Sequence, residues 1–249
     1  MTVHFIGAGP GAADLLTVRA VDLLRRCEVC LYAGTYIDEA VLAHCPSDAT
    51  LIDTQLLDLD QITAHVTRAH DSGLDVARLC SGDPSIYSAL AEQTRRLAAA
   101  GVPWDVTPGV PAYAAAAARL GVELTVPELV QSVVLTRVQA RSTPMPDSEA
   151  LVNFARTRAT LVLHLAIRHV RKLTEVLMPE YGPDCPVAVV YRASQPDELV
   201  LQGRLSSIAE RVAAADLRQA AIIVVGPALQ RGAGAESHLY DGCRDRSTQ

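Results

Sequence analysis

A glycine-rich turn near the start of the chain is the first stretch whose residue types and spacing could do chemistry. An apolar run, Val3–Ile6, leads into Gly7, Gly9 and Ala12, a G-x-G-x-x-A spacing. In dinucleotide-binding folds this spacing lets backbone N–H groups approach a pyrophosphate at the start of a helix. The alternative is a tight strand-to-helix turn that binds no ligand.

Two features of this turn argue against a dinucleotide. A dinucleotide fold needs an acidic residue about 20 positions on, at the end of the second strand, to hold a ribose. The stretch Tyr32–Thr35 contains no acid, and Pro10 removes one backbone N–H from the turn itself. No Gly-Lys-Ser/Thr follows, which also excludes a nucleoside-triphosphate loop. A different ligand stays open.

Three more stretches follow predicted strands and could belong to the same site. They are Ser81-Gly82-Asp83-Pro84-Ser85, Thr107-Pro108-Gly109-Val110-Pro111-Ala112 and Val189-Val190-Tyr191-Arg192-Ala193-Ser194. Taken singly, the first could only cap a helix, the second could be a hinge and the third a surface loop. Ligands gather at the carboxyl ends of parallel strands, so the four stretches together predict one cleft.

Alternating strands and helices must position these stretches. Apolar runs predict strands at Val3–Ile6, Val29–Tyr32, Leu51–Asp53, Val76–Leu79, Trp104–Thr107, Ser132–Thr136, Thr160–Leu165, Val187–Tyr191, Glu198–Leu205 and Ala221–Val225. Helical periodicity predicts helices from Thr17 to Cys27, Ile62–Ser72, Ser85–Ala100, Pro111–Leu120, Arg168–Met178 and Ile208–Ala215, the last capped by Ser206. The pattern indicates an α/β fold with a largely parallel sheet in the first half.

The chain is long enough for two small domains, and we expect three parts. They are an N-terminal α/β domain at 1–111, a C-terminal α/β domain at 112–231 and a flexible tail at 232–249. A Pro-Gly-x-Pro stretch marks the first boundary. No apolar run reaches the ~18 residues of a membrane span and no secretory signal is visible, so we expect a cytoplasmic protein.

The composition limits the kinds of molecule that the chain is expected to bind. The net charge of −6 and the aromatic content of 4% disfavour nucleic acid. The six cysteines are scattered, and the C-x-x-C pair Cys27 and Cys30 falls at a helix end and inside an apolar strand. We therefore expect these thiols to pack in the core rather than to bind a metal or form a redox pair. His164 and His169 are likewise expected to be core or surface residues, and no metal is predicted.

At this point the motifs resemble those of the tetrapyrrole methylases. Gly-Ala-Gly-Pro-Gly followed by Asp-Leu-Leu-Thr, then Ser-Gly-Asp-Pro, then Thr-Pro-Gly-Val-Pro-Ala occur in that order from about Val3 to Pro227. Members of this family transfer methyl groups from S-adenosylmethionine during sirohaem and vitamin B12 synthesis. The second half, in the stretches 121–128, 134–137 and 187–198, looks like the precorrin-4 C11-methyltransferase branch.

The resemblance implies two α/β domains with a cofactor and substrate trough between them, the class III methyltransferase fold, and usually a homodimer. It implies a cofactor site at Pro10, Ser81, Gly82, Asp83, Ile86, Pro111, Ala112, Leu165 and Ala193. Leu165 stands where relatives often have methionine, and Ala193 where some have glycine. Relatives that methylate uroporphyrinogen have an aspartate after the second-strand tyrosine, whereas this chain has Ala33, which argues for a different substrate.

Methyl transfer from a sulfonium to carbon discharges a positive charge, so a strong nearby anion would favour the ground state. Small uncharged residues around the cofactor and accurate positioning of the substrate suit the reaction. No residue of the sequence can be identified as a catalytic base. The tetrapyrrole substrate carries many carboxylates, for which arginine forks are suited. The candidate substrate-binding residues are Arg119, Arg137, Arg141, Arg168 and Arg192.

The leading hypothesis is therefore methyl transfer from S-adenosylmethionine to C11 of precorrin-4. Another family activity remains open, either on cobalt-precorrin-4 or at another ring position. A non-catalytic protein that binds a corrinoid intermediate is an alternative of a different class. A nicotinamide-dependent reductase is a third, weakened by the missing ribose acid.

Overall fold

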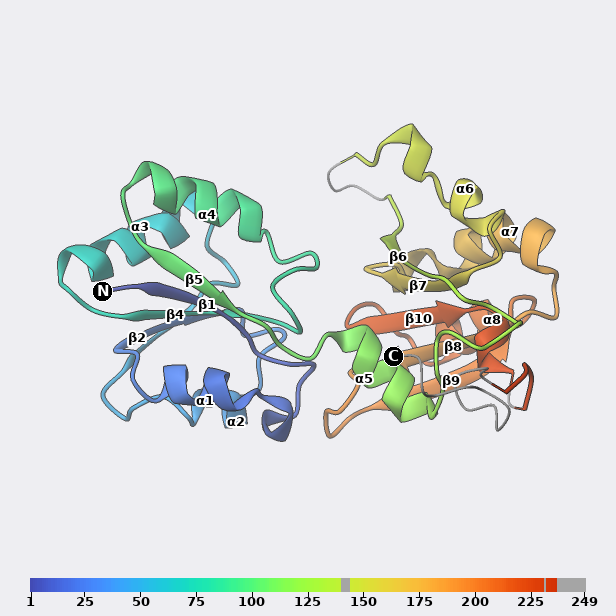
Figure 1. Cartoon of the computed structure of the whole chain (residues 1–249), viewed down its shortest axis with the longest axis horizontal. Coiled ribbons are helices and arrows are strands. Elements are labelled where there is room, and N and C mark those ends of the chain that lie inside the picture. The colour runs from blue at the N-terminus through green and yellow to red at the C-terminus, as the bar shows by residue number, and fades with distance from the viewer. Residues whose placement is uncertain (140–143, 231, 237–249) are drawn as a thin grey trace, which may run out of the picture. The chain divides into compact units, whose positions relative to one another are not determined.

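The computed structural model describes residues 1–139, 144–230 and 232–236. The chain divides into two compact units, each built on a five-stranded sheet with helices (Figure 1). Unit 1 contains Met1–Ala115 and the separate stretch Ala193–Asp197. Unit 2 contains Ala116–Arg192 and the described residues from Glu198 onward. The two units confirm the predicted α/β fold with two domains. Residues 237–249 of the predicted tail lie outside the described part.

The sheet of unit 1 is entirely parallel, with the strand order β3-β2-β4-β1-β5. Its strands are β1 (Val3–Gly7), β2 (Val29–Tyr32), β3 (Thr50–Asp53), β4 (Val76–Cys80) and β5 (Trp104–Thr107). β1 lies between β4 and β5, in register through Gly7 opposite Cys80 and Ile6 opposite Thr107. Because all strands run the same way, the turns after β1, β4 and β5 meet at one edge.

Helices cover both faces of this sheet, as Figure 1 shows. They are α1 (Val18–Leu24), α2 (Glu39–Leu42), α3 (Leu59–Asp71) and α4 (Leu90–Ala99). One core joins α3 and α4 to Phe5 and Val76, and a second joins α1 and α2 to Ile6 and Leu79. Alternate residues of a strand point to opposite faces, which explains why neighbours Phe5 and Ile6 enter different cores.

Local sequence sets several helix boundaries. The predicted cap Thr17 accepts a hydrogen bond from the Ala20 N–H at 3.1 Å, and α1 starts at the next residue. Asp58 and Gln61 form a reciprocal capping box at the start of α3. Gly73, in the left-handed region at φ +74°, follows the end of α3 as predicted.

The sheet of unit 2 has the order β6-β7-β10-β8-β9 and is mostly antiparallel. Its strands are β6 (Val133–Arg137), β7 (Thr160–His164), β8 (Pro186–Tyr191), β9 (Leu199–Arg204) and β10 (Ala221–Val225). Only β6 and β7 pair in parallel among the described strands of this sheet. The strands lie close to their predicted positions, but strand patterns alone do not give strand direction.

The helices of unit 2 pack mainly on one core. α5 (Ala112–Leu120) begins at the end of unit 1, and α6 (Leu151–Ala155), α7 (Val170–Tyr181) and α8 (Ile208–Ala214) follow. Leu173, Leu177 and Ile208 bury against Leu163 and Ile223 of the sheet. The predicted cap Ser206 is wrong, because Ser207 occupies the cap position of α8 and its side chain makes no capping bond.

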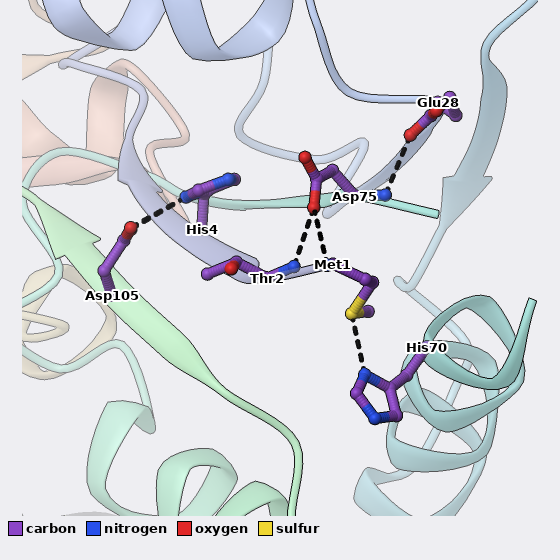
Figure 2. A network of polar contacts seen from close by, with 7 residues as sticks. All are labelled: Met1, Thr2, His4, Glu28, His70, Asp75 and Asp105. Carbon is purple, nitrogen blue, oxygen red and sulfur yellow. Dashed lines mark hydrogen bonds and ion pairs between the residues drawn. The ribbon is translucent and has the colours of Figure 1, made fainter. Parts of the chain in front are cut away.

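A polar network ties together the amino-terminal ends of the unit 1 strands (Figure 2). The Asp75 carboxylate accepts the Thr2 N–H at 2.7 Å, and the Asp75 N–H donates to the Glu28 carboxylate at 2.8 Å. His4 Nδ1 lies 2.9 Å from the Asp105 carboxylate. These contacts join the starts of β1, β2 and β4 and reach β5, at the sheet edge opposite the turns considered below.

Cys27 and Cys30 are buried in the unit 1 core, as their position in apolar segments predicted. Both thiols are free, and burial is the main cause that raises the pKa of Cys27 to about 12. Among the described residues, no group of three or more metal-ligating side chains is placed to hold a metal ion. No helix in the same part of the chain is long and apolar enough to cross a membrane.

Candidate functional site

Backbone amides of the glycine turn after β1 donate to other segments of unit 1. The Ala8 N–H donates to the Cys80 carbonyl at 2.8 Å, and Gly9 and Gly82 exchange N–H···O bonds of 3.2 and 2.8 Å. The Ala12 N–H donates to Ser194 Oγ at 3.1 Å, and Pro10 has no N–H. A pyrophosphate would need these donors, and they already have partners. The turn is therefore built to join strands, not to cradle a phosphate.

Gly7 and Gly109 let the turns after β1, β4 and β5 approach within backbone contact. A Cβ built on Gly7 would lie 2.9 Å from the Gly82 carbonyl oxygen and would overlap the backbone of Gly109. A Cβ on Gly109 would lie 2.7 Å from Gly7 Cα. Only residues without a side chain allow this packing. The motifs that the sequence analysis grouped by strand position are thus one structural unit.

Asp83 holds two of these turns together. Its Oδ2 accepts the Gly109 N–H at 2.8 Å, and its Oδ1 accepts the Ser85 N–H at 2.8 Å and the Ser85 hydroxyl. Partial burial raises the pKa of the Asp83 carboxyl, but the bonds from Ser85 and Gly109 outweigh it and leave the pKa below its usual range. The carboxylate is ionised at neutral pH, with both oxygens engaged.

The segment after β4 is not the helix that its apolar periodicity predicted from Ser85. α4 starts only at Leu90, and Tyr87 and Ala89 lie in the left-handed region at φ +54° and +57°. The interpretation that Asp83 and Ser85 cap a helix is therefore wrong. They shape an irregular loop in which Gly82 is buried, Ile86 is half-buried and Ser81 is exposed.

Residues Ala193–Asp197 lie in the chain between β8 and β9 but belong to unit 1. Ala193 is buried, Ser194 Oγ accepts the Ala12 N–H, and Gln195 Nε2 donates to the Pro10 carbonyl at 3.1 Å. The Gln195 side chain also fills the space beside Gly11 where a Cβ would be. The sequence placed Gln195 only in the family-like stretch 187–198 and did not predict its contact with the glycine turn.

The structure brings eight of the nine predicted cofactor residues into unit 1. Pro10, Ser81, Gly82, Asp83, Ile86, Pro111 and Ala112 lie in or next to the three turns, and Ala193 lies in the stretch that contacts the first turn. A Cβ on Gly82 would lie 3.4 Å from the Ala112 nitrogen and 3.6 Å from Pro111 Cα. Leu165 belongs to unit 2, where it follows β7 with φ +54° and an exposed side chain (65%).

The predicted substrate-binding arginines differ in their surroundings. Arg119 pairs with Glu198, and Arg168 Nε donates to the Arg218 carbonyl at 2.7 Å. Arg137 ends β6 beside a cavity that Lys172 also lines, and Arg192 follows β8 with φ +45°. The fifth candidate, Arg141, lies outside the described residues.

The position after the second-strand tyrosine, Ala33, has a carboxylate close by from another strand. Asp53, at the end of β3, accepts the Gly34 N–H at 3.0 Å and the Gln55 N–H at 2.9 Å. These two bonds lower the pKa of the Asp53 carboxyl. A Cβ on Gly34 would approach Asp53 Oδ2 to 2.5 Å, so glycine is needed for this contact. Sequence analysis did not single out Asp53.

With the fold and the site geometry in place, the comparisons with known proteins identify the family. The family model described as Tetrapyrrole (Corrin/Porphyrin) Methylases matches residues 2–209. The chain belongs to this family. Within it, a curated relative from Rhodococcus erythropolis, named Precorrin-4 C(11)-methyltransferase, is 53% identical over 248 residues and is covered along 100% of both chains.

Solved structures agree with this placement. A cobalt-precorrin-4 methyltransferase of cobalamin biosynthesis matches with a TM-score of 0.89 at 34% identity, covering 92% of this chain and 95% of that one. A uroporphyrin-III C-methyltransferase from Thermus thermophilus, complexed with S-adenyl homocysteine, matches with a TM-score of 0.77 at 29% identity, covering 95% and 97%. The resemblance seen in the motifs is therefore confirmed at the level of the family and the fold.

Proposed function

We propose that this chain is a methyltransferase that transfers a methyl group from S-adenosylmethionine to C11 of precorrin-4, giving precorrin-5 in cobalamin synthesis. The observation that carries the proposal is the 53% identity, along the full length of both chains, to a protein named for this reaction. The absence of an acid at Ala33 supports a substrate other than uroporphyrinogen within the same family.

The strand-end turns of unit 1 fit the cofactor of this family. We propose that Pro10, Ser81, Gly82, Asp83, Ile86, Pro111, Ala112 and Ala193 contact it, and that Leu165 is a further cofactor-binding residue. Gly82 lies in the left-handed region at φ +69°, and a Cβ built on it would face the backbone of two other proposed cofactor residues, Ala112 at 3.4 Å and Pro111 at 3.6 Å. The Ala8, Gly9 and Ala12 amides of the glycine turn already donate hydrogen bonds within the protein, which favours an uncharged or cationic ligand over a phosphate.

The bound cofactor supplies an activated methyl group on a sulfonium. The chain's own residues then have to hold this cation without over-stabilising it. Asp83 is the one carboxylate among the proposed cofactor residues, and its charge is partly balanced by the hydrogen bonds from Ser85 and Gly109. The rigid backbone contacts among Gly7, Gly82 and Gly109 hold the turns in one arrangement. We attribute the rate mainly to this positioning.

We propose that some of Arg119, Arg137, Arg141, Arg168 and Arg192 bind substrate carboxylates. Planar guanidinium groups can bind both oxygens of a carboxylate, which an acidic chain needs for an acidic substrate. Membership of the family also motivates a homodimer in the cytoplasm as further proposals, and sedimentation equilibrium of the purified chain tests the first of them.

The decisive experiment uses methyl-labelled S-adenosylmethionine with precorrin-4 and, separately, cobalt-precorrin-4. We expect label at C11 of precorrin-4, located by carbon NMR of the product. Faster labelling of cobalt-precorrin-4 would favour the second candidate, which the structural match to a cobalt-precorrin-4 methyltransferase supports. Binding of the tetrapyrrole without transfer of label would instead identify a non-catalytic corrinoid-binding protein.

A further inference from the structure

Arg78 is a cationic side chain of β4 whose hydrogen-bond acceptors are all neutral. Its Nε donates to Gln93 Oε1 at 2.9 Å, and its Nη1 donates to Thr54 Oγ1 at 3.4 Å and to the Leu79 carbonyl at 3.3 Å. In the described ranges no carboxylate forms an ion pair with it. Arg78 is half-buried, and a partly desolvated charge without a counter-ion is costly, so its neutral hydrogen-bond partners have to satisfy its donors.

Gln93 connects Arg78 to the loop before α4, because it accepts from Arg78 and donates to backbone carbonyls of that loop. It is a buried polar residue, 5% exposed, and its Nε2 donates to the carbonyls of Ser88 and Ala89, both at 3.3 Å. Ala89 is the residue before α4 and offers no side-chain cap. Gln93 therefore holds the backbone carbonyls at the start of α4, whereas an N-cap side chain would accept from the first N–H groups of the helix.

The loop that Gln93 fixes begins with the proposed cofactor residues. At its start, Gly82 is tied to Gly9 by two backbone hydrogen bonds. Near its end, Tyr87 and Ala89 have left-handed backbones, which side chains other than glycine rarely adopt without support. Residues 81–89 are thus held at one end by the glycine turn and at the other end by Gln93.

Arg78 also reaches the end of the neighbouring strand. Its partner Thr54 donates through Oγ1 to the Tyr32 carbonyl at 3.0 Å, and the Thr54 N–H donates to the same carbonyl at 2.7 Å. One guanidinium therefore links the carboxyl end of β2 with the loop that follows β4.

We propose that Arg78 and Gln93 form a positioning relay that fixes residues 83–89 in their cofactor-binding conformation. The relay deepens the proposed function and rests on it, because it assumes that S-adenosylmethionine binds at this edge. Neither residue is proposed to touch the cofactor. They act through the carbonyls of Ser88 and Ala89 and through the end of β2.

The substitution Gln93→Glu separates the relay from general stability. A glutamate keeps the size of the side chain and gives Arg78 an ionic partner, but it cannot donate to the Ser88 and Ala89 carbonyls. The double variant Arg78→Met with Gln93→Leu removes both partners, so neither is left buried and unsatisfied by the other. Matched controls are Arg95→Met, exposed on α4, and Gln131→Glu, exposed in unit 2.

Two measurements are made on the full chain: calorimetric titration with S-adenosylhomocysteine and amide hydrogen exchange of residues 83–92 in the free protein. Gln93→Glu should still fold, weaken binding by about tenfold and speed exchange of this segment by a similar factor, because its carboxylate also repels the Ser88 and Ala89 carbonyls. The double variant should show the same changes, and the kcat/KM for S-adenosylmethionine should fall through KM. Both controls should behave as the parent.

Unchanged exchange and unchanged affinity in a folded Gln93→Glu protein would overturn the relay. A parent that does not bind S-adenosylhomocysteine would overturn the proposed function, whereas the exchange rates would still show whether Gln93 holds the loop. If the double variant unfolds while Gln93→Glu binds normally, Arg78 is structural only and the relay is wrong.

Discussion

At the scale of single residues, the site depends on side chains that hydrogen-bond within unit 1. Asp83 is the clearest case, because its two oxygens join the loop after β4 to the loop after β5. Its charge is held by local N–H and O–H donors, and no cation among the described residues forms an ion pair with it. A carboxylate in this state can be lost by protonation as well as by mutation.

Asp83→Asn tests this dependence on charge. Since the folded-state pKa of Asp83 is below the unfolded value, its contribution to stability is complete above about pH 4 and disappears as pH falls through the folded-state pKa. At pH 7 the variant should lose about 1 kcal/mol in urea unfolding. The difference from the parent should shrink toward pH 3, and the control Asp71→Asn should show no such convergence. A constant difference across pH would contradict the argument.

At the scale of elements, the three turns at the carboxyl edge of the unit 1 sheet form one closely packed group. Strand ends and glycine spacing predicted which turns belong together, because both are local properties of the sequence. The contact between Gly7 and Gly109 could not be predicted, because it depends on β5 pairing beside β1. The start of α4 was misplaced, because the apolar spacing of Ile86 and Leu90 continues through a loop.

Gly109→Ala tests how tightly these turns pack. The new Cβ would meet the backbone of Gly7 and Gly82, which cannot move aside as a flexible side chain could. We expect a loss of about 2 kcal/mol in the free energy of unfolding, measured in urea, together with weaker binding of S-adenosylhomocysteine.

The matched control is Gly203→Ala in β9, where the nearest atom to a new Cβ is Ser207 Oγ at 3.4 Å. This variant should be as stable as the parent or slightly more stable, because alanine restricts the unfolded chain. Equal stability of the two alanine variants would show that the turns are loosely packed.

At the scale of the whole molecule, an acidic chain is proposed to act on an acidic substrate. The motifs and composition predicted the two α/β units, the family and the repulsion expected between a chain of net charge −6 and a substrate with many carboxylates. They could not predict that the second sheet is mostly antiparallel, since apolar runs of this kind read the same in either direction. Nor could they predict which arginines are already paired, as Arg119 is with Glu198.

The sign of the salt effect on KM tests whether local arginines or the negative net charge of the chain dominate the interaction with the substrate. If arginines attract the substrate locally, its KM should rise several-fold between about 50 and about 500 mM salt. If the net charge of −6 dominates, KM should fall instead, which would contradict the proposed arginine contacts. Arg192→Ala should raise KM and weaken its salt dependence, whereas Arg204→Ala, which removes a surface pair with Asp184, should do neither.

The stretch Ala193–Asp197 means that the two units are not two consecutive pieces of chain. A fragment ending near Ala115 would lack the groups that bond to Ala12 and Pro10, however well its own sheet formed. Chimaeras that exchange halves between relatives would combine a glycine turn from one parent with a Ser194–Gln195 pair from the other. A chimaera should therefore take residues 193–197 from the same parent as its first half, although these residues lie in the second half of the sequence.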